Sequence, residues 1–241
     1  MDTGRVFFLP NSKDVQTIRA VTLESHLANV TRLAQAWAPE KAFLQVPPHR
    51  QPLFVQTRPK LIRAAERHDE GKRHRFRIDR NGNGELVYSY RGHRFDVTDH
   101  DLYVELLVRL HHNAYSVSDI NDAIARLRLN PGLKEMAELF PFDAYALQMC
   151  DQITAEVEIY ALDDQNPRKP EFMEFKTERL DEQNIAVAPY PFREKEVVLT
   201  VDYADISVPP EIAQDTGKLT ALVKEATPSV QSKEVILCPS A

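Results

Sequence analysis

The chain has 241 residues and a formal net charge of −6, and 43% of its residues are hydrophobic while 27% are charged. This composition excludes a low-complexity chain and fits one large domain, or one domain with a small addition. We expect no secretory signal, and no run approaches the roughly eighteen apolar residues of a membrane span, so we predict a cytoplasmic protein without a membrane partner. Two cysteines, Cys150 and Cys238, are too few for a disulfide framework or a thiolate metal site.

Charge is distributed unevenly along the sequence. Residues 58–94 contain eleven Lys or Arg against five Asp or Glu, whereas residues 163–241 contain nine against fifteen. A basic segment can attract a polyanion even when the net charge is negative, so the first segment is compatible with a nucleic-acid partner. Solvated surface charge without a partner is the alternative explanation.

Hydrophobic periodicity and turn residues predict a series of helices followed by strands. Apolar residues three and four positions apart predict a helix over 17–38, which ends before Pro39. Pro59, at a position that tolerates proline, opens a second predicted helix over 59–71. The further predicted elements, in chain order, are a turn at 79–84, a strand at 86–90, helices at 99–112, 117–128, 131–140 and 143–161, and strands at 197–201 and 235–237.

A linker separates the helical part of the sequence from the last strands. Residues 163–170 are rich in Pro, Asp and Asn, which favour turns over regular structure. We therefore predict a mainly α fold, with a helical domain over residues 1–162. Residues 163–241 would form the linker and a small strand-rich C-terminal appendage, α/β or β.

The dipeptide His68-Asp69 lies near the end of the second predicted helix. Neighbouring helix residues point about 100° apart, so both side chains can line one pocket. An imidazole supplies one nitrogen ligand, and a carboxylate supplies two oxygens that can bridge two cations. Lys72 follows on the same helix face and could place a positive charge beside a phosphate. Adjacent His and Asp also occur on ordinary exposed surfaces, so this motif alone is not specific.

Three further positions carry polar groups on apolar predicted helices. His111-His112 end a strongly apolar helix, where two imidazoles need polar partners or a metal. His26 lies on the first predicted helix, and Asp151 is a carboxylate in an apolar stretch of the last one. A buried, unpaired carboxylate costs free energy that a metal ion can offset. Each residue, taken alone, is also compatible with a hydrogen-bonded polar group in the core.

Taken together, these residues form an ordered series that resembles a known family. The pattern resembles the HD nuclease domain of the CRISPR type I interference helicase–nuclease, and the resemblance covers residues 20–160. Other HD phosphohydrolases fit less well, because they typically lack both the Gly-Lys extension and the paired histidines. The most specific parts are Leu23…His26-Leu27…Val30, His68-Asp69-Glu70-Gly71-Lys72 followed by Phe76, and His111-His112.

The resemblance implies an HD-superfamily helical bundle around a site for two divalent metal ions. It implies that one ion is held by His26, His68, Asp69 and Asp151. Asp69 would bridge to a second ion held by His111, His112 and one further histidine. His93 and His100 are both candidates for that ligand, and we prefer His93, because Gly92 and the preceding strand could direct it into the pocket. The family often has Gly after its paired histidines, where this chain has Asn113.

The activity implied by the resemblance is metal-dependent endo- or exonucleolytic hydrolysis of single-stranded DNA in antiviral defence. Asp69 and Lys72 would act at the reacting phosphate. The histidine-rich ligand set favours Mn, Fe, Co, Ni or Zn, with Mg as the alternative. No P-loop motif occurs, so a helicase module would be a separate chain or a missing part of a longer polypeptide. The other implied partner is a CRISPR surveillance complex.

Two other functions are compatible with the same sequence. One is an HD-superfamily phosphohydrolase acting on small nucleotides, which the basic residues 58–94 would also suit. The other is a non-enzymatic HD scaffold that binds partners through its acidic C-terminal part. The intact set of candidate ligands argues against the scaffold.

Overall fold

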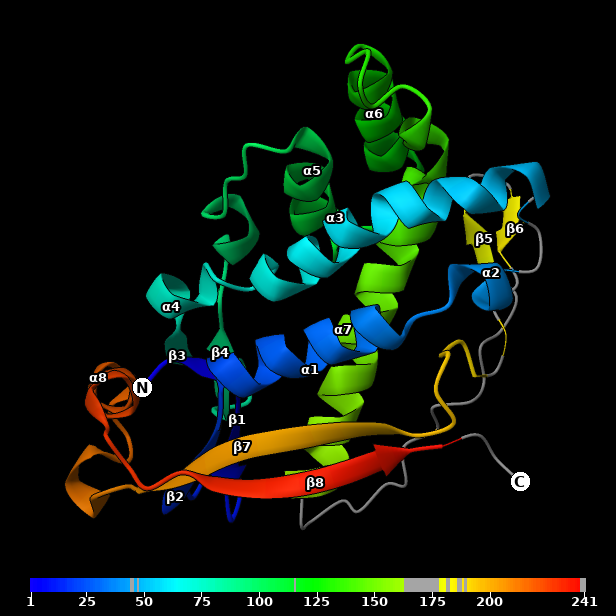
Figure 1. The fold of residues 1–241 in the computed structure, drawn as a ribbon. Coiled ribbons are helices and arrows are strands. Elements are labelled where there is room, and N and C mark those ends of the chain that lie inside the picture. Colours follow the sequence, from blue (N-terminus) through cyan, green and yellow to red (C-terminus); the bar gives the residue numbers. More distant parts are fainter. Residues whose placement is uncertain are drawn as a thin grey trace.

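A computed structural model describes residues 1–43, 46, 48–114, 116–162, 178–180, 183–185, 188 and 190–238. Helices cover one face of an antiparallel four-stranded sheet (Figure 1). The strands are β1 (Thr3–Leu9), β2 (Thr17–Thr22), β3 (Arg77–Arg80), β4 (Leu86–Ser89), β5 (Glu178–Leu180), β6 (Gln183–Ile185), β7 (Val197–Ser207) and β8 (Gln231–Leu237). The helices are α1 (Leu23–Ala36), α2 (Pro39–Ala42), α3 (Phe54–Arg67), α4 (Lys72–Arg75), α5 (Leu102–Leu110), α6 (Val117–Arg128), α7 (Phe140–Leu162) and α8 (Thr216–Glu225). Short 3₁₀ helices are η1 (Pro48–Leu53), η2 (His93–Phe95), η3 (Met136–Leu139) and η4 (Pro210–Ile212).

The large sheet joins the beginning and the end of the described chain. Its strand order is β1-β2-β7-β8, and all neighbouring strands are antiparallel. β2 pairs with β7 from Thr17 opposite Ser207 to Val21 opposite Tyr203. The remaining strands form two separate hairpins, β3–β4 and β5–β6. The N-terminal and C-terminal parts of the chain therefore share one backbone hydrogen-bond network.

The prediction of a mainly α fold with a C-terminal appendage is wrong, because the fold is mixed α/β and its sheet contains both parts. The predicted helix over 17–38 is in fact β2 followed directly by α1. Ile18 and Ala20 are buried on one face of β2, but the strand is so short that its apolar residues extended the helical pattern. The predicted linker, residues 163–170, lies outside the described residues.

Most other elements follow the local pattern of the sequence. The helix predicted over 117–128 matches α6, and the predicted strands lie at β4, β7 and β8. The helix predicted over 131–140 is instead a turn followed by η3, and β1 and α8 were not predicted.

Side chains of α1 bind the backbone of β7 beyond the point where β2 ends. Thr22 caps α1 by accepting a hydrogen bond from the Ser25 N–H at 3.1 Å. The Ser25 hydroxyl and the Asn29 amide each donate to the Thr200 carbonyl at 2.8 Å. The Asn29 side-chain oxygen in turn accepts from the Thr200 N–H at 3.0 Å. These bonds fix the turn of α1 that carries His26.

Two apolar clusters hold the helices on the sheet. The larger one contains Trp37, Tyr103 and Leu107 from the helical layer together with Leu199 of β7, all fully or almost fully buried. The smaller one joins β2 and the β3–β4 hairpin to α8. No helix in the described part of the chain is long and apolar enough to cross a membrane.

Candidate metal centre

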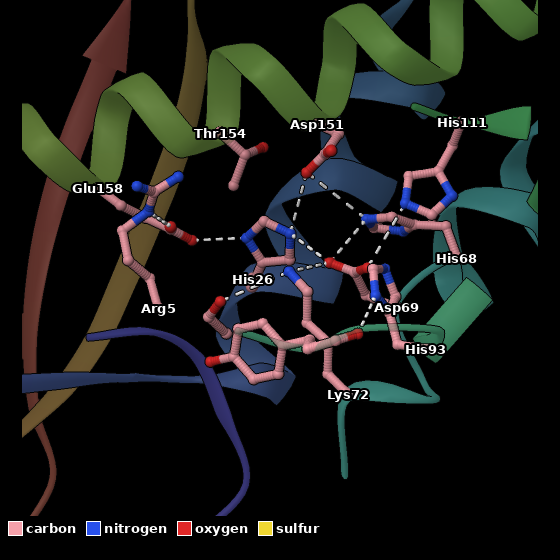
Figure 2. Close-up of polar contacts among 12 residues, drawn as sticks. Arg5, His26, His68, Asp69, Lys72, His93, His111, Asp151, Thr154 and Glu158 are labelled. Carbon is pink, nitrogen blue, oxygen red and sulfur yellow. Dashed lines mark hydrogen bonds and ion pairs between the residues drawn. The ribbon is translucent and has the colours of Figure 1, made fainter. Parts of the chain in front are cut away.

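The predicted ligands converge beside α7, around the carboxylate of Asp69 (Figure 2). His26 comes from α1 and Asp151 from α7. His68 is the C-terminal capping residue of α3, and Asp69 follows it in a turn, so the helix predicted over 59–71 extended too far. His111 holds the same capping position on α5.

The first ligand group consists of His26, His68, Asp69 and Asp151. The His26 Nε2 atom lies 3.1 Å from Asp69 Oδ2 and 3.1 Å from Asp151 Oδ1. His68 Nε2 lies 3.4 Å from the same Asp69 oxygen and 3.7 Å from the same Asp151 oxygen. One potential ligand atom from each residue lies within 4.8 Å of the others, so this buried group could bind a metal ion.

The second ligand group consists of Asp69, His93, His111 and His112, and it meets the same 4.8 Å limit. His93 Nε2 lies 2.9 Å and His111 Nε2 lies 3.6 Å from the other Asp69 oxygen, Oδ1. His112 packs against His111 with ring centroids 3.9 Å apart, and its side chain is 44% exposed. The second group therefore reaches solvent at His112.

Asp69 is the shared member, and each of its oxygens faces a different group. Oδ2 faces the first group and Oδ1 faces the second. Within the described residues, neither oxygen has a hydrogen-bond partner of normal geometry. The same is true of the buried Nε2 atoms of His26, His68, His93 and His111. Buried polar atoms are rarely left in this state, and so many in one place fit ligands for a cation.

The tautomers of the histidines direct lone pairs at this centre. The Nδ1 atoms of His68, His93 and His111 lie 2.9, 2.8 and 2.6 Å from the backbone carbonyls three residues earlier. A carbonyl only accepts, so each Nδ1 must donate a proton, and the neutral ring then presents a lone pair at Nε2. A lone pair facing a carboxylate oxygen is repulsive unless a proton or a metal ion lies between them. This arrangement is typical of metal-binding histidines.

The chain offers His93 and leaves His100 at the surface. The His100 side chain is 79% exposed and contacts Arg63 and Asp99. His93 is brought close to Asp69 by the approach of two backbone segments. A Cβ atom at Gly71 would lie 2.0 Å from the His93 carbonyl oxygen, so the glycine of the His-Asp-Glu-Gly-Lys motif permits this contact.

Glu158 and Arg5 belong to the centre, and sequence reasoning missed both. Glu158 is fully buried, and its carboxylate lies 2.7 Å from His26 Nδ1 and 3.1 Å from Arg5 Nε. The Nδ1 atom of His26 thus lies against a carboxylate, whereas the Nδ1 atoms of His68, His93 and His111 lie against backbone carbonyls. Glu158 lies seven residues after Asp151, two turns along the same face of α7, and this spacing was the available indication. For Arg5, on β1, the sequence contained no such indication.

Lys72 lies inside the centre, at the start of α4. Its ammonium forms an ion pair with Asp69 Oδ2 and lies 5.0 Å from the centre of the Tyr90 ring. Only 11% of its side chain is exposed. The predicted Lys72 therefore contacts the shared carboxylate directly.

The charges of the centre keep its carboxylates ionised. Burial would raise the pKa of Asp69, but Lys72 and His68 hold it well below its usual range. Burial likewise opposes ionisation of Asp151, whose pKa is nevertheless lowered by His26 and His68. In contrast, burial lowers the pKa of His112 to about 3, and the neighbouring His111 adds to the effect. Ionised carboxylates and neutral imidazoles are the forms that bind metals, so His112 is ready to bind, whereas His68 must first lose a proton because Asp69 raises its pKa to about 9.

Comparison of the chain with protein-family models, curated proteins and solved structures finds no match. The resemblance to the HD nuclease domain therefore remains a prediction based on the motifs. The geometry brings together all the predicted ligands, His26, His68, Asp69, His93, His111, His112 and Asp151, and places Lys72 beside them.

Proposed function

We propose that this protein is a metal-dependent phosphodiester hydrolase that cleaves single-stranded DNA. The observation that carries the proposal is the position of Asp69, whose two oxygens face two separate groups of metal-ligand residues. The donor set of imidazoles with two carboxylates suits divalent Mn, Fe, Co or Ni, with Mg as the alternative.

Each part of the centre would have a distinct task. Two bound divalent cations would supply a lowered pKa for water and compensation for the charge of a phosphate under attack. Asp69 would hold both cation positions in register, and Lys72 would add a fixed positive charge beside the phosphate. The half-exposed His112 marks the side from which a phosphate can approach. No side-chain nucleophile is required.

The basic segment of the sequence favours a polymer over a small nucleotide. Beside α4 and the β3–β4 hairpin lies a groove of about 560 Å³, lined by His74, Arg75, Arg77 and Arg91 together with Ser89 and the carboxylates of Asp79 and Asp96. Arg75 is paired with Asp96, at 2.5 Å, whereas the exposed Arg77 and Arg91 extend the positive surface. Arg91 lies two residues before His93, so a bound strand could continue from this groove to the centre. A small-nucleotide phosphohydrolase remains the second candidate.

The biological setting follows from the motif resemblance alone. We propose that the protein acts in CRISPR antiviral defence, with a helicase module and a surveillance complex that deliver single-stranded DNA. Because β7 and β8 belong to the central sheet, these partners would bind the folded whole and not a separate C-terminal appendage.

The deciding experiment compares wild-type protein with Asp69→Ala, using labelled single-stranded DNA and a panel of nucleotides with Mn²⁺, Co²⁺ or Ni²⁺. We expect wild-type protein to bind close to two metal ions and to cleave DNA in preference to nucleotides. Asp69→Ala should lose cleavage and most of the bound metal while remaining folded. Asp143→Asn, which alters another buried carboxylate, is the matched control. Wild-type turnover by a folded Asp69→Ala protein would reject the two-metal centre, and nucleotide hydrolysis without DNA cleavage would favour the second candidate.

A further inference from the structure

A pocket of about 230 Å³ lies next to the second ligand group, between η2, α5 and α6. Three of its lining residues directly follow or precede candidate ligands in the chain. Arg94 follows His93, while Leu110 and Asn113 flank the His111-His112 pair. The backbone segments that carry His93 and the His111-His112 pair therefore also carry residues that line this pocket.

Phe95 provides an exposed aromatic surface at this pocket. Its side chain belongs to η2, and the residue is 60% exposed. The Arg94 guanidinium lies 5.0 Å from the centre of the Phe95 ring and donates to the Asn113 side-chain oxygen at 3.0 Å. An exposed ring beside a fixed cation is the combination on which single-stranded nucleic acids stack their bases.

The rest of the pocket suits the edge of a nucleobase. Its floor is apolar, with Leu106, Leu110 and Ala123. Its walls carry both hydrogen-bond donors, on Arg109 and Arg126, and acceptors, on Asp119 and Asp122. A nucleobase presents apolar faces and an edge of mixed donors and acceptors, and this combination matches the apolar and polar side chains of the lining.

We propose that this pocket binds one unstacked nucleobase of the strand whose phosphate lies at the metal centre. The inference rests on the proposed function, and it adds a reason for the choice of single strands. A base paired within a duplex is stacked on its neighbours and could not lie against Phe95. The strand would be held by its backbone at the basic groove and by a base at the Phe95 pocket.

The test measures binding of the metal-free protein, in the presence of EDTA, to a fluorescent single-stranded oligonucleotide and to a fluorescent abasic oligonucleotide of equal length. Phe95→Ala should weaken binding of the base-containing strand by between about fivefold and about 150-fold, as for loss of one stacked base. It should leave binding of the abasic strand unchanged. Phe95→Trp should retain base-dependent binding, Phe95→Leu should lose it without loss of apolar volume, and Leu129→Ala, at another exposed apolar residue, should have no effect.

Three results would overturn the proposal that this pocket binds a nucleobase. They are absence of binding by wild-type protein, equal binding of both oligonucleotides, and equal weakening of both by Phe95→Ala. Cleavage assays with Mn²⁺ separate this inference from the proposed function. Base-dependent binding through Phe95 without any metal-dependent cleavage would reject the nuclease and keep the pocket. Metal-dependent cleavage by Phe95→Ala, with wild-type affinity for the base-containing strand, would support the nuclease and reject the pocket.

Discussion

Asp69 and Asp143 are both buried carboxylates of the helical layer, but their surroundings differ in kind. Asp143, on α7, accepts a hydrogen bond from the Tyr103 hydroxyl at 2.7 Å. Burial raises the pKa of Asp143 to about 6, and the hydrogen bond from Tyr103 offsets only part of this effect. Asp69 faces imidazole nitrogens and Lys72 instead, and its pKa is held well below the usual range despite burial. The same functional group is a partly protonated core residue in one place and a permanent anion in the other.

The comparison teaches that burial alone does not make a carboxylate a metal ligand. Asp143 meets a donor, so it is satisfied without an ion. Asp69 meets the Nε2 atoms of histidines whose own donors are already bound to backbone carbonyls. A metal centre is therefore distinguished by several buried ligand atoms that converge on one carboxylate, and the predictions below test this distinction.

The largest expected effect is the loss of the folded structure around both Asp69 and Asp143 when residues 163–241 are deleted. The deletion removes β7, whose backbone binds Ser25 and Asn29 of α1 and whose Leu199 fills the main core. We expect the fragment 1–162 to be insoluble, or to show neither cooperative unfolding nor metal binding. Soluble expression, circular dichroism and metal content measure this outcome. A folded, metal-loaded fragment would show that the helical layer forms without the sheet.

A second prediction separates the two ligand groups by pH. Burial lowers the pKa of His68, but the neighbouring Asp69 outweighs this effect and raises the pKa to about 9. In the metal-free protein His68 is therefore protonated at pH 7. A metal must displace that proton, and its affinity for the first group should rise about tenfold per pH unit for each displaced proton. Burial lowers the pKa of His112 to about 3 and also lowers the pKa of His111, so these two ligands of the second group are already neutral between pH 6 and 8 and release no proton to a metal.

Titration with Co²⁺ at pH 6, 7 and 8 measures the metal affinity of each ligand group separately, in variants that each retain only one group. His112→Ala disables the second group and should retain a steep increase of affinity with pH. His26→Ala disables the first group and should give a shallower increase of affinity with pH, because His111 and His112 have no proton to lose. Equal slopes in the two variants would contradict the assigned protonation states.

A third prediction concerns Glu158, which orients His26 through Nδ1. Glu158→Gln keeps the shape of the side chain but removes the charge that stabilises the proton on this nitrogen. The affinity of the first group should fall by about 10- to 100-fold, as for other partners of metal-binding histidines. Thr154→Val is the matched control, because Thr154 lies on the same helix and its hydroxyl donates to the Cys150 carbonyl. Calorimetric Co²⁺ titration in the His112→Ala background measures the affinity of the first group. An affinity that Glu158→Gln leaves unchanged would contradict the role of Glu158 in orienting His26.

The difference between Asp69 and Glu158 also shows what the sequence can predict. The candidate ligands were predicted because rare polar residues recur in a fixed order on apolar helices, and this pattern is local. Lys72 was predicted from its spacing of four residues after His68 on one helix face, but it lies at the start of α4, outside the helix that ends at Arg67. Glu158 stands in an ordinary helical sequence, and its significance depends on Arg5, which lies 153 residues away in the chain. Long-range partners leave no local periodicity.

The fold shows the same division between local and distant information. Helix α6 follows directly from its apolar spacing, because its hydrogen bonds join residues four apart. Strand β2 was mistaken for a helix, since its partners on β7 lie far away and its own six residues lead directly into α1. The mixed α/β fold thus depended on pairing that no single segment could indicate.

The smallest expected effect on the metal centre comes from Asp143→Asn, which should change stability and leave metal binding intact. The pKa of Asp143 is about 6 in the folded chain, above its ordinary value of 3.8. Between these pH values the folded state binds more protons than the unfolded state, so stability falls as pH rises through about 6. Asparagine cannot ionise, and the variant should lose this part of the pH dependence, about 1–3 kcal/mol between pH 4 and pH 8. Urea unfolding of metal-free wild type and variant measures the difference, because titration of the metal ligands is common to both proteins. Identical pH profiles would show that Asp143 is not destabilised by its burial. Loss of metal from Asp143→Asn would show that the two buried carboxylates are coupled through α7, and the contrast between them would no longer hold.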